Sequence, residues 1–373
     1  MYNILTLNKI AACGTDLFDK ANYTVGSDVE NPTGILVRSA KMHDMAFGEE
    51  LLAIGRAGAG TNNIPVDKCA EQGIVVFNSP GANANAVKEL VVAGLLLASR
   101  KVTKAVQWAA DLKDTEEANV GAQVEKGKSQ FGGCEITGKT LGIIGLGAIG
   151  RKVAKAASAL GMSVVGTDPF LSDAAAQEIA DCCKVVATKE EVYTEADYLT
   201  IHVPFNADTK GFVNAETIAQ MKDGVKILNF ARGELVNDAD LKAALETGKV
   251  ACYVTDFPNA DTVNVDGIVA IPHLGASTAE SEDNCAIMAA NELIDYIENG
   301  NIKNSVNFPN VSLDAAGKKT TILHKADADL SGIAADAKAT GTKGGFGYTI
   351  LAGDVDAEAV KAIDGVIRVR VLA

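Results

Sequence analysis

The sequence predicts an α/β protein with two doubly wound parallel sheets, followed by a small α+β module. Three observations support this fold class. Up to about residue 90, short apolar runs alternate with helical segments, as in parallel sheets covered by helices. From about residue 139 six more such runs follow: TLGIIG, SVVGTD, YLTIHV, VKILNF, VACYVTDF and IVAIP. In the tail, strands TTILHKA, FGYTILAGD and GVIRVRVLA are expected to be separated by two short helices.

In the first block the expected strands are YNILTL, GILVRS, LLAIGRAG and GIVVFNS. A long apolar segment from Glu89 to about Ala109 then reads as a buried connecting helix, and a second long helix ends near Ile297. We expect a discontinuous substrate domain (1–92 and 272–312), an inserted domain (93–271) and a C-terminal module (318–373) joined by the polar segment NFPNVSLDAAGKK.

Composition excludes several classes of protein. The net charge of −14 over 373 residues argues against a nucleic-acid-binding protein, which normally has a basic face. No apolar run approaches the roughly 20 residues that span a bilayer, and no signal peptide opens the chain. The seven cysteines are scattered without a CxxC pair, which predicts reduced thiols in a cytoplasmic protein without a metal site.

The segment LGIIGLGAIG contains a GxGxxG pattern at Gly145, Gly147 and Gly150. The pattern follows an expected strand and opens an expected helix, which is the context of a dinucleotide site. The first glycine makes the turn, the second lets backbone N–H groups approach a pyrophosphate, and the third lets helix and strand pack closely. Ala148 and Ile149 begin the helix whose N-terminus would face that charge. The alternative is a glycine-rich turn in a domain that binds no nucleotide.

Asp168 ends the next expected strand, 23 residues after Gly145. An acidic residue at this position hydrogen-bonds the adenosine ribose hydroxyls and repels a 2′-phosphate. The residues after it, PFLSD, contain no basic side chain. We therefore expect NAD rather than NADP as the cofactor.

A dehydrogenase also needs an acid/base group and a group that holds the substrate. His273 follows the last expected strand of the inserted domain, at the sheet edge where such folds bind ligands. Arg232, in NFARGELVN, follows another strand of the same sheet, and its guanidinium could grip a carboxylate through two hydrogen bonds. We expect His43 to lie on the surface and His202 to be structural, while His324 belongs to the tail.

The chain resembles the D-isomer-specific 2-hydroxyacid dehydrogenases. The resemblance covers residues from about 35 to 300 and rests on IGRAGAGTNNIPVDKCAEQGIVVFNSPGANANAVKELV, FGGCEITGKTLGIIGLGAIGRKVA, NFARGELVN and PHLGAST. It implies a Rossmann NAD domain inserted into a flavodoxin-like catalytic domain. It also implies that Arg232 binds the substrate, that His273 is the acid/base and that a carboxylate backs the histidine. Pro204 and Ala231 are implied as further cofactor contacts.

That carboxylate departs from the family's pattern. The family shows a glutamate in D-V-F-x-x-E-P, whereas this chain has TDFPNADTVN and no glutamate between Glu246 and Glu280. Counting from Arg232 by the family's spacing leads to Asp261, which we therefore predict as the partner of His273. Asp256 matches the aspartate that binds the nicotinamide carboxamide in the family.

The resemblance further implies substrate contacts in the first domain, at Arg38, Ser39, Arg56, Asn83 and Asn85. The two arginines favour a phosphorylated 2-hydroxy acid over an unphosphorylated one such as glycerate or lactate. A second alternative is a non-catalytic NAD-sensing interaction protein built on the same fold. The tail resembles an ACT-type regulatory module whose second strand, at KATGTKGG, is shortened. The resemblance also implies that the protein assembles as a homodimer or homotetramer.

Overall fold

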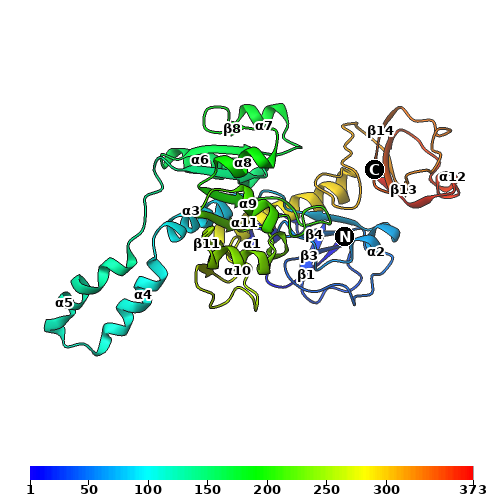
Figure 1. The fold of residues 1–373 in the computed structure, drawn as a ribbon. Coiled ribbons are helices and arrows are strands. Elements are labelled where there is room, and N and C mark those ends of the chain that lie inside the picture. The colour runs from blue at the N-terminus through cyan, green and yellow to red at the C-terminus, as the bar shows by residue number, and fades with distance from the viewer. Residues whose placement is uncertain (373) are drawn as a thin grey trace. The chain divides into compact units, whose positions relative to one another are not determined.

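A computed structural model describes residues 1–372. The chain divides into two compact units, Met1–Asn83 with Thr278–Ala373 and Ala84–Ser277, whose elements are labelled in Figure 1. Each unit contains a parallel sheet covered by helices, which confirms the α/β class. No helix within residues 1–372 combines the length and the apolar character needed to cross a membrane.

The first unit is built on a five-stranded parallel sheet with the order β2-β1-β3-β4-β5. This order is that of the flavodoxin-like fold. Four strands match the predicted runs, whereas β2 was not predicted because only one of its four residues, Tyr23, is buried and no apolar run marks it. The strands are β1 (Tyr2–Leu7), β2 (Tyr23–Gly26), β3 (Gly34–Val37), β4 (Ala53–Arg56) and β5 (Val75–Asn78).

Helices cover both faces of this sheet. Helices α1 (Ala12–Thr15) and α11 (Ala279–Ile294) pack together, and a Cβ added at Gly14 would lie 2.7 Å from Ala286. Glycine is thus required for the two helices to approach so closely. Helix α2 (Val66–Glu71) buries Cys69 in a separate core that also contains Ile54 and Val76 of the sheet. A π-helical turn, Asp295–Asn299, extends α11.

Helix α11 carries a buried carboxyl group at Glu292. Its Oε1 accepts a hydrogen bond from Asn304 Nδ2 at 2.8 Å, whereas Oε2 has no partner among residues 1–372. Burial raises the pKa of Glu292 from 4.5 to about 8, although the Asn304 hydrogen bond acts in the opposite direction. The side chain is therefore neutral in the folded protein at neutral pH, where the unfolded chain would be ionised.

We expect Glu292→Gln to stabilise the protein at neutral and alkaline pH. Because the folded pKa is raised, the stability that Glu292 contributes is complete below about pH 4.5 and is lost as pH rises toward about 8. The loss amounts to at most about 1.4 kcal/mol per pH unit in that interval. The melting temperatures of the wild type and of Glu292→Gln, measured from about pH 4.5 to about pH 8, should diverge as pH rises. Glu280→Gln, at an exposed position of the same helix, is the control, and parallel wild-type and Glu292→Gln curves would contradict the expectation.

The second unit contains a seven-stranded parallel sheet with the order β12-β11-β10-β9-β6-β7-β8. This is the Rossmann order with one extra strand, and the order reverses between β6 and β9. Six strands match the predicted runs; the seventh, β8, has two residues and was not predicted. The strands are β6 (Thr140–Ile144), β7 (Ser163–Thr167), β8 (Lys184–Val185), β9 (Tyr198–Ile201), β10 (Val225–Asn229), β11 (Val250–Thr255) and β12 (Ile268–Ala270).

Two cores lie on the two faces of this sheet. One contains Val91 of α3 and Val153 of α6, and the other contains Tyr193 of α8 and Leu241 of α10. The helices of the unit are α3 (Ala84–Ser99), α4 (Val102–Ala110), α5 (Glu117–Gly127), α6 (Ala148–Ala159), α7 (Asp173–Gln177), α8 (Lys189–Glu195), α9 (Ala215–Gln220) and α10 (Asp238–Glu246). Single 3-10 turns are formed by Asp111–Asp114, Lys128–Phe131 and Gly233–Leu235.

The predicted connecting helix from Glu89 to Ala109 is wrong in its bounds and partly in its burial. Helix α3 starts earlier and stops at Ser99, whose hydroxyl bonds Leu95 O at 2.6 Å and Tyr198 OH at 2.7 Å. A separate helix, α4, follows, and none of its residues is buried. Figure 1 shows α4 and α5 as a helical pair that extends away from the sheet of this unit. The apolar side chains of α4 misled the prediction because periodicity does not show whether a partner covers them.

The tail forms an antiparallel sheet with the order β14-β15-β13-β16. Its elements are β13 (Lys319–Lys325), β14 (Ala337–Lys343), β15 (Phe346–Ala352), α12 (Ala357–Lys361) and β16 (Val366–Leu372). The first short helix expected there is absent from the described chain: between β13 and β14 the Asp329 carboxylate accepts from Ser331 N and forms a turn. The segment KATGTKGG, expected to be a shortened strand, contains six of the seven residues of β14, from Lys338 to Lys343.

This tail packs firmly on the rest of its unit. Arg370 donates to the carbonyl oxygens of Tyr296 (3.2 Å) and Ile297 (2.7 Å), and Tyr348 OH donates to Gly300 O at 2.5 Å. Phe308, within the segment predicted to be a polar linker, is fully buried in the core that the tail shares with α11. The linker expectation is therefore wrong, because Phe308 and Val311 are buried in that core and Leu313 packs against it.

Candidate active site

The glycine pattern forms the turn between β6 and α6. Gly145 has φ +96°, and a Cβ there would lie 2.6 Å from the carbonyl oxygen of His202. A Cβ at Gly150 would lie 2.0 Å from Gly145 O, so only glycine allows this contact of helix and strand. A Cβ at Gly147, by contrast, would meet none of the described atoms within 4 Å. The turn thus leaves open space at the N-terminus of α6, next to Ala148 and Ile149, where a pyrophosphate fits.

Asp168 directly follows β7 and holds this turn. Its Oδ2 accepts from Leu146 N at 2.9 Å, and its Oδ1 accepts from Phe170 N at 2.9 Å. Each carboxylate oxygen can accept a further hydrogen bond. The side chain is therefore anchored beside the glycine turn and retains the capacity to bind ribose hydroxyls.

Arg232 lies just beyond β10, after Ala231. Asn229 Nδ2 donates to Arg232 O at 2.8 Å and fixes this turn. The guanidinium donates to Ala231 O at 2.6 Å and lies 5.6 Å from the centre of the Phe257 ring. None of the ion pairs within residues 1–372 includes Arg232. Its remaining donors are available to an anionic ligand.

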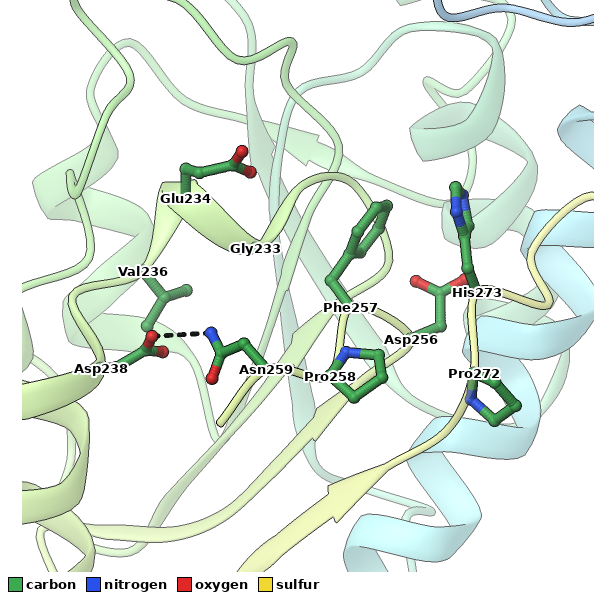
Figure 2. A pocket seen from close by; sticks show the side chains of 10 residues that line it. All are labelled: Gly233, Glu234, Val236, Asp238, Asp256, Phe257, Pro258, Asn259, Pro272 and His273. Carbon is green, nitrogen blue, oxygen red and sulfur yellow. Dashed lines mark hydrogen bonds between the residues drawn. The ribbon is translucent and has the colours of Figure 1, made fainter. Parts of the chain in front are cut away.

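His273 and Arg232 both lie next to the Phe257 ring. The ring centres of Phe257 and His273 are 4.6 Å apart. A cavity of about 640 Å³ opens here (Figure 2) and is lined by Gly233, Glu234, Val236, Asp238, Asp256, Phe257, Pro258, Asn259, Pro272 and His273. All of these residues follow the carboxyl ends of β10, β11 and β12. They therefore lie at the carboxyl edge of the sheet, where the sequence predicted that a ligand binds. Phe257 was not predicted as a site residue, and no pattern in the sequence marked it.

Asp256 is the buried carboxylate of this cavity. Its Oδ2 accepts from Gly275 N at 2.9 Å, and Oδ1 is buried without a hydrogen-bond partner in the described chain. Burial raises the pKa of Asp256, while the Gly275 N–H, His273 and Arg232 act in the opposite direction. The carboxylate thus lies close enough to both predicted catalytic side chains for their charges to interact. An unpaired buried oxygen indicates that a donor from a ligand or a moving side chain completes the site.

Asp261, the predicted partner of His273, lies elsewhere. It is exposed, and its Oδ1 accepts from Lys242 Nζ of α10 at 2.7 Å. No hydrogen bond joins it to His273 within residues 1–372, and it does not line the cavity. Of the other carboxylates that do, Asp238 accepts from Asn259 Nδ2 at 2.8 Å, and Glu234 lies across the cavity from His273 in Figure 2. This geometry favours Asp256 over Asp261 as the partner.

The other histidines agree with their predicted structural roles. His202 Nε2 is 3.1 Å from Thr200 Oγ1, and burial lowers its pKa to about 3, so the ring stays neutral. His324 lies 2.7 Å from Lys325 O and 3.1 Å from Thr349 Oγ1 in the tail sheet. His43 is exposed. Pro204, the remaining predicted cofactor contact, lies exposed after β9, and its carbonyl accepts from Thr209 Oγ1.

The predicted substrate residues of the first unit cluster at the carboxyl edge of its sheet. Arg38 follows β3 and pairs with Glu282 at 2.6 Å. Arg56 ends the neighbouring strand β4, and its guanidinium occupies the space where a side chain at Gly58 would begin. Ser39 N donates to Asn8 Oδ1 at 3.0 Å. Asn83 is the last residue of the first segment of this unit. Asn85 lies in α3 of the other unit, and its Nδ2 donates to Glu89 Oε1 at 2.9 Å.

The glycine turn, the anchored Asp168 and the Arg232–His273 cavity define the dinucleotide-binding domain of a dehydrogenase. Residues 93–275 match the family model described as "D-isomer specific 2-hydroxyacid dehydrogenase, NAD binding domain". Residues 93–275 are therefore an NAD-binding domain of the kind that this family model describes.

Among curated relatives, D-3-phosphoglycerate dehydrogenase of Bacillus subtilis is 36% identical over 294 residues, which are 76% of this chain and 53% of the relative. The human enzyme of the same name is 32% identical over 291 residues, 75% of this chain and 52% of the relative. The chain thus spans about half the length of the curated relatives it matches. Among solved structures, an NAD⁺-bound 3-phosphoglycerate dehydrogenase of Entamoeba histolytica has a TM-score of 0.64 at 26% identity, covering 82% of this chain and 98% of that one.

Proposed function

We propose that this chain is an NAD-dependent D-3-phosphoglycerate dehydrogenase, which oxidises 3-phospho-D-glycerate to 3-phosphohydroxypyruvate on the route to serine. The observation that carries the proposal is that His273 and Asp256 line one cavity of an NAD domain, with the Arg232 guanidinium over the ring of Phe257, which also lines it. The names of the relatives supply the substrate.

Each side chain has a distinct part in the proposed reaction. Bound NAD⁺ supplies the hydride acceptor. Arg232 holds the substrate carboxylate through paired hydrogen bonds, and the His273 imidazole takes the proton of the C2 hydroxyl. Asp256, buried beside it, stabilises the positive charge that develops on the ring. Phe257 lies beside both Arg232 and His273.

The phosphate requires further cations, and we assign it to Arg56 and Arg38, with Ser39, Asn83 and Asn85 as additional substrate contacts. The support is two arginines at the carboxyl ends of neighbouring strands. A hydrogen bond to a charged group is worth about 1.5–3 kcal/mol, so Arg56→Ala should raise KM for the phosphorylated substrate roughly 10- to 150-fold. KM for unphosphorylated hydroxypyruvate should change much less.

A substrate panel tests the proposal directly. The full chain is assayed with NAD⁺ and 3-phospho-D-glycerate, D-glycerate or D-lactate, and with NADH and the matching 2-keto acids. Preference for the phosphorylated pair supports the proposal. Preference for D-glycerate, hydroxypyruvate or lactate would assign another D-2-hydroxyacid dehydrogenase. NADH binding without turnover of any substrate would assign a non-catalytic NAD-sensing protein.

We expect Asp168→Ser to reduce the preference for NAD over NADP. The variant removes the negative charge that faces the ribose and repels a 2′-phosphate. The ratio of kcat/KM for the two cofactors measures the effect, and Asp173→Ser, at the first turn of α7, is a control outside the glycine turn. Equal wild-type rates with limiting NAD and NADP would contradict the role given to Asp168.

The same proposal includes a cytoplasmic enzyme that assembles as a homodimer or homotetramer. All seven cysteines are free, which supports a reducing compartment. Val102 and Val106 of α4 are exposed apolar side chains, which support burial against a second copy. For the tail we propose a degenerate ACT-like module, supported by its four-stranded antiparallel sheet with one flanking helix.

A further inference from the structure

A cluster of polar side chains lies at the opposite edge of the NAD-domain sheet from the active site. Cys134 precedes β6, Tyr198 begins β9, and Lys226 is the second residue of β10. The glycine turn, Arg232 and His273 all follow the carboxyl ends of strands. None of these three cluster residues takes part in the reaction proposed above.

The contacts centre on the Cys134 sulfur. Lys226 Nζ lies 3.5 Å from Cys134 Sγ and 3.3 Å from the Tyr198 hydroxyl, which is itself 3.5 Å from the sulfur. The Tyr198 hydroxyl is also 2.7 Å from the Ser99 hydroxyl. The ammonium lies 4.5 Å from the centre of the Tyr198 ring. Lys226 Nζ therefore donates to the sulfur, and the Tyr198 hydroxyl lies within hydrogen-bonding range of it.

The Lys226 ammonium forms no ion pair with a carboxylate among residues 1–372. Its hydrogen bonds go to the Cys134 thiol and the Tyr198 phenol. Because the Lys226 side chain is half-buried, its charge favours ionisation of the more acidic neighbour, which is the thiol. Tyr198 is fully buried and Cys134 is partly exposed, so the sulfur is also the group that a reagent can reach.

The direction of the pKa shifts agrees with this geometry. The Tyr198 hydrogen bond lowers the pKa of Cys134; burial acts against it, and the charges of Lys226 and, farther away, Lys139 add to it. Burial raises the pKa of Tyr198. The pKa of two other partly exposed thiols, Cys13 and Cys182, is raised by burial and by aspartates nearby.

We propose that Cys134 is a reactive thiolate and a site of oxidation by peroxides, independent of the dehydrogenase reaction. The thiolate sulfur attacks one oxygen of the peroxide, an S–O bond forms and the O–O bond breaks. Sulfur is oxidised to a sulfenic acid, and the peroxide is reduced. Lys226 or Tyr198 donates a proton to the departing hydroxide, which leaves as water.

Site-resolved alkylation tests the thiolate. The full chain is treated with limiting iodoacetamide between about pH 6 and 9, a range around the ordinary thiol pKa of about 8.5, and the rate at each cysteine is read from its peptide by mass spectrometry. Near pH 7, Cys134 should react about 10-fold faster than Cys13 and Cys182, as a thiol beside a lysine does. Equal alkylation rates at Cys134, Cys13 and Cys182 would overturn the proposal. This experiment uses the wild-type protein and needs no variant.

Two variants separate charge from accessibility. Lys226→Met should slow Cys134 alkylation about 10-fold near pH 7, because the cation that lowers the thiol pKa is lost, whereas Lys226→Arg should retain most of the rate. An unchanged rate in a folded Lys226→Met protein would overturn the assignment. For oxidation, hydrogen peroxide followed by dimedone should label Cys134 and leave Cys134→Ser unlabelled at that peptide; absence of label in the wild type would overturn that step.

Discussion

Replacing His273 with alanine should lower kcat by at least about 10²-fold, the usual contribution of a general acid/base. Among the described residues, His273 is the only histidine that lines the cavity, and its ring lies against Phe257. NADH should bind as in the wild type, because the glycine turn and Asp168 lie outside the altered cavity. Steady-state kinetics with saturating cofactor and NADH fluorescence titration measure the two quantities.

His43→Ala is the matched control, since His43 is an exposed histidine in the other unit. It should leave both kcat and NADH affinity unchanged. If the folded His273→Ala protein keeps near-normal turnover, His273 is not the acid/base, and the reaction must use another proton acceptor.

Replacing Asp256 with asparagine should lower kcat about 10- to 150-fold, which corresponds to the 1.5–3 kcal/mol of a hydrogen bond to a charged group. Asparagine can still accept from the Gly275 N–H, so the loop geometry should persist, but the charge beside His273 is lost. Because kcat is measured at saturating NAD⁺, the fall reports on the reaction rather than on cofactor affinity.

Asp261→Asn provides the matched control five residues away. Its carboxylate is exposed and pairs with Lys242, so the same change should alter kcat by less than about twofold, the scale of a surface ion pair. If Asp261→Asn loses as much activity as Asp256→Asn, the loop must close on substrate and bring Asp261 to His273. If Asp256→Asn weakens NADH binding and leaves kcat intact, Asp256 serves only the nicotinamide carboxamide.

Much of the cofactor site could be predicted because it is encoded locally. Gly145 takes a positive φ in the turn, Gly150 packs on Gly145 O within the same strand–turn–helix segment, and Asp168 follows the next strand. Arg232 and His273 could be placed at one sheet edge because each follows a predicted strand, and parallel strands bring their carboxyl ends together.

The predictions that failed concerned which distant elements of the chain pack against a given segment. The apolar periodicity of residues 89–109 predicted one buried helix, yet α3 ends where Ser99 bonds Tyr198, a residue 99 positions away. The segment around Phe308 was predicted to be a polar linker, although its apolar side chains Phe308, Val311 and Leu313 pack in a core shared with the tail. Pattern alone does not identify such partners, because they come from elements far along the chain.

The sequence by itself determined the two parallel sheets, the NAD turn and the identity of the two residues proposed to bind and deprotonate the substrate. Only the tertiary structure decided which carboxylate stands beside His273. Asp256 and Asp261 are both acidic and lie on the same loop, but Lys242 of α10 pairs with Asp261 at the surface while the Gly275 N–H holds Asp256 in the cavity. The structure likewise brought Cys134, Tyr198 and Lys226 together from three separate segments. Their chemistry depends on distances of a few ångströms, and only the packed sheet sets those distances.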